Sequence, residues 1–109
     1  MTVFIIARME IRTQLYRLLQ CIPHDRVATY GQLARLLNKR KNARHIGRLL
    51  GQNDHPDMYP CYKVVAADGS LTGYSAPGGI RTKREMLLSD GIVFKINGKV
   101  DLAVSGWKS

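Results

Sequence analysis

The sequence predicts a mainly helical domain with small β-hairpins, of the winged helix-turn-helix class. Two short apolar-faced segments flank a polar turn at residues 38–42, which is the pattern of a helix-turn-helix. Two downstream turn signals, at residues 67–70 and at Asn97-Gly98, are typical of hairpins. The third observation is charge, because the 109 residues carry a formal net charge of +9. A chain of this length is expected to form one domain over residues 1–109.

Apolar residues recur at helical spacing in four stretches of the chain. We expect helices at about residues 8–21, 30–38, 43–51 and 80–89. Thr29 is the expected N-cap of the second helix, because its hydroxyl can accept a hydrogen bond from the first turn. Gly51 and Gly91 are placed to end the third and fourth helices.

Two hairpins are expected after the helix-turn-helix. The β-branched pair Val64-Val65 favours a strand, and residues 71–74 are expected to return beside it across the turn at 67–70. A hairpin in this place is a wing. The second hairpin pairs residues 92–96 with 99–102 across Asn97-Gly98, a strong type I′ signal.

A lone cysteine stands behind a proline where the chain enters the first strand. Pro60 fixes its own φ and pushes Tyr59 towards extended geometry, so Cys61 is expected to sit in a rigid turn. That placement suits a nucleophile that must hold one pose. The alternative is a small buried apolar residue, since free cysteine is among the most buried types.

Most of the net charge lies in the helix-turn-helix segment. Residues 26–53 contain seven basic side chains and no acid: Arg26, Arg35, Lys39, Arg40, Lys41, Arg44 and Arg48. A solvated helix face would mix both signs, so this segment predicts a polyanionic partner, nucleic acid before an anionic membrane. A membrane-surface helix would need aromatic residues opposite the basic face, and the segment has only Tyr30.

Other classes of site and location are not favoured by the composition. Two cysteines are too few for a disulfide framework, and neither has the neighbours of a zinc site, so no metal or cofactor is expected. No segment is long enough to span a bilayer. We expect a monomer of the cytoplasm, or of the nucleus in a eukaryotic cell, with no membrane partner.

Taken together, the motifs resemble those of one family in order and spacing across residues 10–92. They are Val27-Ala28-Thr29-Tyr30-Gly31-Gln32-Leu33-Ala34, Ala43-Arg44-His45-Ile46-Gly47, Asn53, Pro60-Cys61-Tyr62-Lys63-Val64-Val65, Gly73-Tyr74-Ser75, Lys83 with Leu87-Leu88, and Asp90-Gly91. This pattern is similar to the DNA-binding domain of O6-alkylguanine-DNA alkyltransferases. The resemblance implies binding of double-stranded DNA through the minor groove, extrusion of an O6-alkylguanine and irreversible transfer of its alkyl group to a cysteine.

The resemblance also implies roles for single residues. Cys61 would accept the alkyl group, and Arg44 would fill the gap that the extruded base leaves in the stack. Tyr30 would crowd the target phosphate, and Asn53 would brace the turn before the cysteine. The remaining pair, Tyr74 and Ser75, would bind the extruded guanine, with Ser75 against its O6. The basic side chains expected to bind DNA are Arg35, Lys39, Arg40, Lys41 and Arg48.

The chain departs from the family pattern beside the cysteine. The family usually has a histidine there, linked through water to a carboxylate, whereas this chain has Tyr62 and the carboxylate of Asp90. Tyrosine is a poor base at neutral pH, so the change predicts slow reaction of Cys61 or another base, such as Asp90 acting through a relay. A cation at Lys63 would lower the pKa of the thiol.

The length of the chain leaves a second hypothesis open. Single-domain relatives are often alkyltransferase-like proteins, which bind O6-alkylguanine without repairing it and signal to nucleotide excision repair proteins. Those relatives typically replace the cysteine, whereas this chain has Cys61 and the Gly73-Tyr74-Ser75 motif. The two hypotheses are therefore a suicide alkyltransferase and a lesion sensor.

Overall fold

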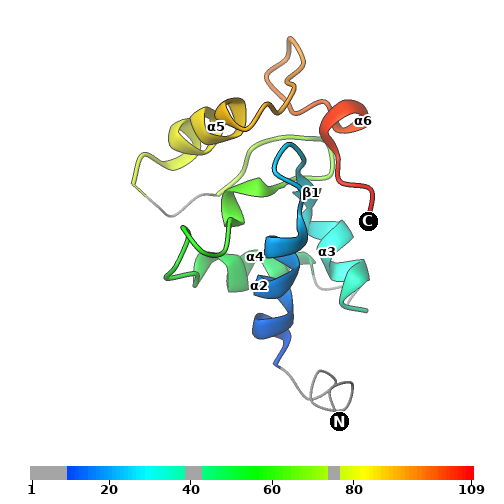
Figure 1. Ribbon diagram of the computed structural model, residues 1–109, viewed down its shortest axis with the longest axis vertical. Coiled ribbons are helices and arrows are strands. Elements are labelled where there is room, and N and C mark those ends of the chain that lie inside the picture. The colour runs from blue at the N-terminus through cyan, green and yellow to red at the C-terminus, as the bar shows by residue number, and fades with distance from the viewer. Residues whose placement is uncertain (1–9, 39–42, 74–76) are drawn as a thin grey trace.

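The computed structural model describes residues 10–38, 43–73 and 77–109, and helix labels follow Figure 1. The helices are α2 (Ile11–Cys21), α3 (Tyr30–Leu36), α4 (Ala43–Gly51), α5 (Gly79–Ser89) and α6 (Leu102–Ser105), with a 3-10 turn η1 (Cys61–Lys63). The strands are β1 (Ala28–Thr29) and β2 (Val64–Val65). Figure 1 shows α2, α3 and α4 gathered towards one end of the molecule and α5 and α6 towards the other. The predicted class, mainly helical and winged-helix-like, is confirmed.

The helix-turn-helix forms from local sequence signals. Thr29 Oγ1 accepts a hydrogen bond from the Gln32 N–H at 3.1 Å, and Gln32 Oε1 accepts one from the Thr29 N–H at 3.4 Å. This reciprocal capping box starts α3 at the expected residue. In α4 the residues Ile46, Leu49 and Leu50 are buried, which leaves the opposite face of the helix to solvent.

The two strands divide the core into two apolar clusters. β1 and β2 are parallel, with Ala28 opposite Val64 and Thr29 opposite Val65. Successive strand residues point to opposite faces of a sheet, so Val64 joins the cluster of α2, α3 and α4. Val65 joins the cluster that includes Leu87 of α5. The cysteine turn, which leads directly into β2, is thereby fixed between both halves of the domain.

The expected wing is wrong over residues 71–73, which form no strand. The turn at 67–70 is present, because Ala66 N–H donates to Ser70 O at 3.0 Å. However, β2 finds its partner in β1, and the carbonyls of Val64 and Thr72 both accept hydrogen bonds from the ammonium of Lys83. A side chain therefore links the two segments where a backbone ladder was expected.

The second hairpin is present in a shorter form. Phe94 and Val100 form an antiparallel bridge, and Lys95 N–H donates to Lys99 O at 2.8 Å across the Asn97-Gly98 turn. The returning strand ends earlier than expected, because Asp101 accepts a hydrogen bond from Ala103 N–H and caps α6.

The carboxyl-terminal segment packs against β1. Val27 N–H donates to Ser105 O at 2.8 Å, and Trp107 N–H donates to Val27 O at 2.7 Å. In addition, Gln32 Nε2 donates to Trp107 O at 2.8 Å. These bonds tie the last residues to the start of the helix-turn-helix. Among the described residues, no helix has the length and hydropathy needed to cross a membrane.

Candidate active site and nucleic-acid interface

Cys61 opens the η1 turn and carries a free thiol. Its N–H donates to Tyr59 O at 2.7 Å, and its own carbonyl accepts a hydrogen bond from Val64 N–H. The side chain is half-buried at the edge of the first apolar cluster. The backbone is therefore held on both sides of the sulfur, as the sequence predicted, while the thiol keeps partial access to solvent.

Asn53 spans the loop that precedes the cysteine. Its Nδ2 donates to Tyr59 O at 2.8 Å, and its Oδ1 accepts from His55 N–H at 2.9 Å. One amide side chain thus fixes both ends of the loop, and the acceptor carbonyl belongs to the residue that also receives the Cys61 N–H. This geometry agrees with the bracing role that the resemblance implies for Asn53.

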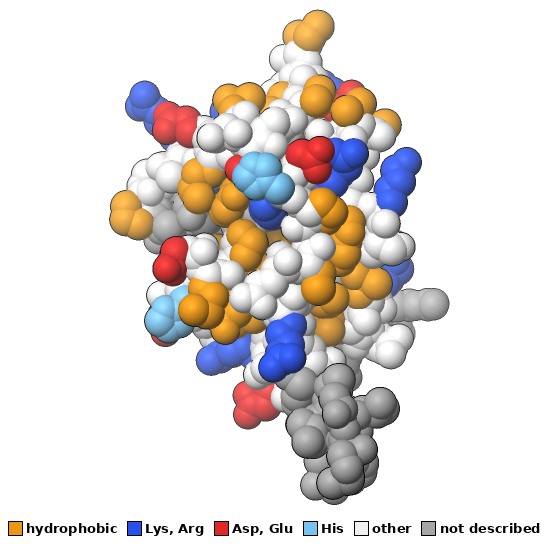
Figure 2. Space-filling view, in the orientation of Figure 1, with side chains coloured by type: hydrophobic (Ala, Val, Ile, Leu, Met, Phe, Trp, Pro, Cys, Tyr) orange, Lys and Arg blue, Asp and Glu red, His pale blue; other side chains and the backbone are white. Residues whose placement is uncertain are grey.

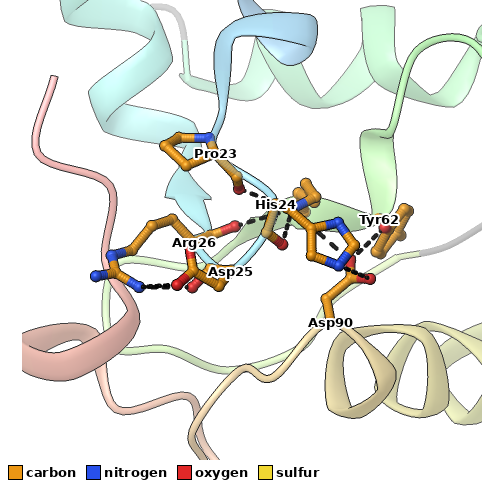
Figure 3. Close-up of polar contacts among 7 residues, drawn as sticks. Pro23, His24, Asp25, Arg26, Tyr62 and Asp90 are labelled. Atoms are coloured by element: carbon orange, nitrogen blue, oxygen red, sulfur yellow. Dashed lines mark hydrogen bonds and ion pairs between the residues drawn. The ribbon is translucent and has the colours of Figure 1, made fainter.

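Tyr62 and Asp90 come together, although they lie on different elements. The Tyr62 hydroxyl donates a hydrogen bond to Asp90 Oδ2 from the η1 turn, and Asp90 is the C-cap of α5. Figure 3 shows that Tyr62 and His24 both reach this carboxylate. The Nε2 of His24 lies 3.4 Å from Asp90 Oδ1.

Lys63 binds the loop of residues 23–26. Its ammonium donates to the carbonyls of Pro23, His24 and Arg26, and it lies 3.7 Å from Asp90 Oδ2. Burial lowers the pKa of Lys63, while the charge and hydrogen bond of Asp90 oppose that shift. Lys63 therefore joins η1 to residues 23–26, and its effect on the thiol stays a prediction.

Lys83 is the site residue whose role sequence reasoning missed. It is 1% exposed, and its Nζ donates to Val64 O at 2.6 Å and to Thr72 O at 2.9 Å. Burial lowers the pKa of Lys83 to about 8, and the nearby Cys61 charge acts in the opposite direction. A signal was available, because Lys83 lies four residues before the buried Leu87 and so occupies the apolar face of α5.

Tyr30 contacts Thr72, the residue whose carbonyl accepts a hydrogen bond from Lys83. Its hydroxyl shares a hydrogen bond of 3.0 Å with Thr72 Oγ1, and Thr72 O accepts from Lys83. The first residue of α3 is thus connected through Thr72 to the lysine beside the cysteine turn.

Three of the basic residues expected to meet DNA are exposed on the helix-turn-helix, namely Arg35 of α3 and Arg44 and Arg48 of α4. Arg44 is the second residue of α4, which agrees with the place expected for a side chain that enters the base stack. The remaining predicted site residues, Lys39, Arg40, Lys41, Tyr74 and Ser75, lie outside the described residues. Their roles stay predictions.

Comparison with known proteins gives a consistent result. The chain is 45% identical over 93 residues to a bifunctional methyltransferase/endonuclease of Picrophilus torridus, covering 85% of this chain and 30% of that protein. It is 33% identical over 95 residues to the methylated-DNA–protein-cysteine methyltransferase of Cricetulus griseus, covering 87% of this chain and 45% of that one. The chain therefore spans less than half the length of either relative.

Two solved structures are similar in fold and in sequence. The Mycobacterium tuberculosis OGT in complex with DNA superposes with a TM-score of 0.70 at 32% identity, over 75% of this chain and 50% of that chain. The S. pombe ATL in complex with DNA gives a TM-score of 0.76 at 27% identity, over 94% and 99% of the two chains. The family profile described as "6-O-methylguanine DNA methyltransferase, DNA binding domain" matches residues 10–92. With the cysteine turn and the helix-turn-helix in the arrangement described, the chain belongs to the 6-O-methylguanine DNA methyltransferase family.

Proposed function

We propose that this chain repairs duplex DNA by transferring the alkyl group of O6-alkylguanine irreversibly to Cys61. The observation that carries the proposal is the free, half-buried thiol on the η1 turn, next to the buried ammonium of Lys83. The names of the relatives, methylated-DNA–protein-cysteine methyltransferases, support the same chemistry.

The reaction is a single displacement. The Cys61 sulfur forms a bond to the alkyl carbon as the bond from that carbon to guanine O6 breaks, and the electron pair stays with guanine. The thiol gives up its proton and the departing guanine takes one up, so the products are an unmodified base and a thioether. A thioether does not return to a thiol under these conditions, so each molecule reacts once.

Cys61 needs help to react, because an ordinary thiol is only a few per cent ionised at neutral pH. In this proposal the Lys83 ammonium stabilises the thiolate, as a neighbouring cation does at other reactive cysteines. The thiol proton passes to the Tyr62–Asp90 pair, where Tyr62 can accept it while giving its own proton to the carboxylate.

The DNA interface lies on the helix-turn-helix in this proposal. Arg35, Lys39, Arg40, Lys41 and Arg48 contact phosphates, and extrusion of the base, which costs a few kcal/mol, is offset by Arg44 entering the stack and by Tyr30 at the target phosphate. The extruded guanine then lies against Tyr74 and Ser75, and a phenolic proton from Tyr74 meets the charge that develops on it.

The proposal is tested by mass spectrometry of the protein after incubation with a duplex containing one O6-methylguanine. We expect the peptide with Cys61 to gain one methyl group, the duplex to regain guanine, and the Cys61→Ser variant to do neither. Tight binding to the methylated duplex with unchanged protein mass and unchanged base would overturn it.

That second outcome would instead support a lesion sensor. The S. pombe ATL in complex with DNA, which matches 94% of this chain and 99% of its own, is the observation that favours this alternative. A sensor would bind O6-alkylguanine as a monomer and recruit nucleotide excision repair proteins in the cytoplasm or nucleus. Cys61 favours the transferase, since a sensor does not need a reactive thiol.

A further inference from the structure

Asp90 lies at the meeting point of three groups. The Tyr62 hydroxyl donates to its Oδ2, the Lys63 ammonium lies 3.7 Å from the same oxygen, and the His24 imidazole lies 3.4 Å from Oδ1 (Figure 3). The Asp90 side chain is 10% exposed, whereas that of His24 is 79% exposed. Tyr62, Lys63 and His24 therefore form a cluster around the Asp90 carboxylate, which extends from the cysteine turn to the solvent.

The loop that carries His24 is fixed in place. Its carbonyls at Pro23, His24 and Arg26 all accept hydrogen bonds from the Lys63 ammonium. Lys63 belongs to η1, the same turn as Cys61 and Tyr62. Figure 2 shows exposed histidine, acidic and basic side chains on this face of the molecule. The contact between His24 and Asp90 is thus supported by a buried lysine rather than left to a free loop.

We propose that His24 is a positioning residue of the Cys61 site, which acts through Asp90 on Tyr62 and makes the reactivity of Cys61 depend on the charge of its imidazole. The residue that directly follows the cysteine is Tyr62, and His24 reaches the same carboxylate from another loop. The inference rests on the proposed function and deepens it, because it names the group that gives this site its pH response.

The direction of the effect follows from competition for one carboxylate. Imidazole side chains change charge between about pH 5 and 8. A protonated His24 draws on the negative charge of Asp90, so the carboxylate is a weaker acceptor for Tyr62, and Tyr62 a weaker acceptor for the thiol proton. A neutral His24 leaves Asp90 free to accept, so Cys61 reacts faster above this pH range.

Other charged groups also lie around the carboxylate. Lys63 faces Asp90 from η1, and burial lowers its pKa while Asp90 and Asp25 oppose that shift. Asp25 and Arg26, on the same loop as His24, form an ion pair of 3.0 Å with each other. Carboxylates titrate well below this range and guanidinium groups well above it, so the imidazole is the group expected to respond.

The experiment measures the rate at which iodoacetamide alkylates Cys61 between pH 5.5 and 9.5. The sulfur displaces iodide and releases its proton to solvent, so the reaction reports the thiolate without any DNA. Cys21 is exposed and is replaced in a Cys21→Ser background, so that only one thiol reacts. The variants are His24→Gln, which keeps a neutral N–H donor for Asp90, and His55→Gln, which removes another exposed histidine.

Protonation of the thiol lowers the alkylation rate in every variant. In the parent protein and in His55→Gln we expect an additional loss of about two- to fivefold as pH falls through the imidazole range, which is the scale of an exposed ion pair. His24→Gln should lack this additional loss, which forms the lower limb of the pH profile, and should keep the rise in rate that comes from ionisation of the thiol. The same inflection should appear in the ring ¹³C signal of Tyr62, assigned with Tyr62→Phe, and should vanish in His24→Gln.

A lower limb that survives in His24→Gln, or a Tyr62 signal that does not follow His24, overturns the inference. The outcome is separate from that of the proposed function. If Cys61 never takes a methyl group from DNA but its iodoacetamide profile still depends on His24, the transferase proposal fails and this inference stands. If methyl transfer occurs but the iodoacetamide profile does not depend on His24, the transferase proposal stands and this inference fails.

Discussion

Replacing Lys83 by methionine should change how the stability of the protein depends on pH. The side chain is 1% exposed, and burial lowers its pKa from an ordinary 10.5 to about 8. The unfolded chain holds this proton up to about pH 10.5, whereas the folded protein releases it from about pH 8. Between these values the unfolded state binds more protons, so the free energy of unfolding rises with pH.

The size of this rise follows from the shift in pKa. Each unit is worth about 1.4 kcal/mol, so the shift from 10.5 to about 8 corresponds to roughly 3 kcal/mol. The unfolding free energy of the parent protein minus that of Lys83→Met should therefore rise by roughly 3 kcal/mol between pH 8 and 10.5. Tyrosine ionisation near pH 10 occurs in both proteins and largely cancels in the difference.

The assay is urea denaturation followed by far-ultraviolet circular dichroism at half-unit steps from pH 7.5 to 10.5. Lys95→Met is the matched control, because Lys95 is exposed, and its difference from the parent should stay flat. A flat difference for Lys83→Met as well would mean that the folded protein does not hold a destabilised ammonium at this position.

Two further substitutions, at Asn53 and Arg44, test parts of the site, and a third, at Gly69 with Gly51 as its control, tests the turn at residues 67–70. Asn53→Ala removes two hydrogen bonds of the loop before the cysteine and should cost about 1–3 kcal/mol in urea denaturation, and unchanged stability would contradict its bracing role. Gly69→Ala places a Cβ against the backbone oxygen of Val100 at a φ of +88°, so it should destabilise by more than about 1 kcal/mol. Gly51→Ala, with open space around its Cβ, is the control and should be neutral or stabilising in the same assay. Arg44→Ala should weaken binding to a methylated duplex in fluorescence anisotropy, and equal affinity would argue against a role in the base stack.

The local elements could be predicted from sequence because local signals define them. The capping box of Thr29 and Gln32 starts α3, and the apolar spacing of Ile46, Leu49 and Leu50 gives α4. The rigid cysteine turn was also predictable, because Pro60 fixes its own φ and restricts the backbone of Tyr59 before it. In each case the residues that decide the structure lie within a few positions of one another.

The pairing of β2 was not predictable in this way. The strand at Val64-Val65 was correct, but its partner lies some 36 positions earlier, at Ala28-Thr29, and nothing local in the sequence points to it. The expected partner segment is connected instead through the Lys83 side chain. A lysine on the apolar face of a helix was a visible anomaly, but which backbone carbonyls it would meet depended on the tertiary fold.

The candidate site was predicted in part for the same reason. The family motif indicated Cys61, Tyr62 and Asp90, and the structure brings Tyr62 and Asp90 into contact. No motif indicated His24, because its position beside Asp90 depends on Lys63 holding the loop from another element. Roles for Tyr74 and Ser75 stay predictions of the sequence.

In the proposed reaction, one sulfur of this protein takes one alkyl group from DNA, once. This is measured by following, over time, how many guanines are restored per protein molecule when O6-methylguanine duplex is in excess. We expect a plateau at one restored guanine per protein molecule, and no restored guanine with Cys61→Ala. Restoration that continues past one equivalent, or none at all with the lesion bound, would contradict it.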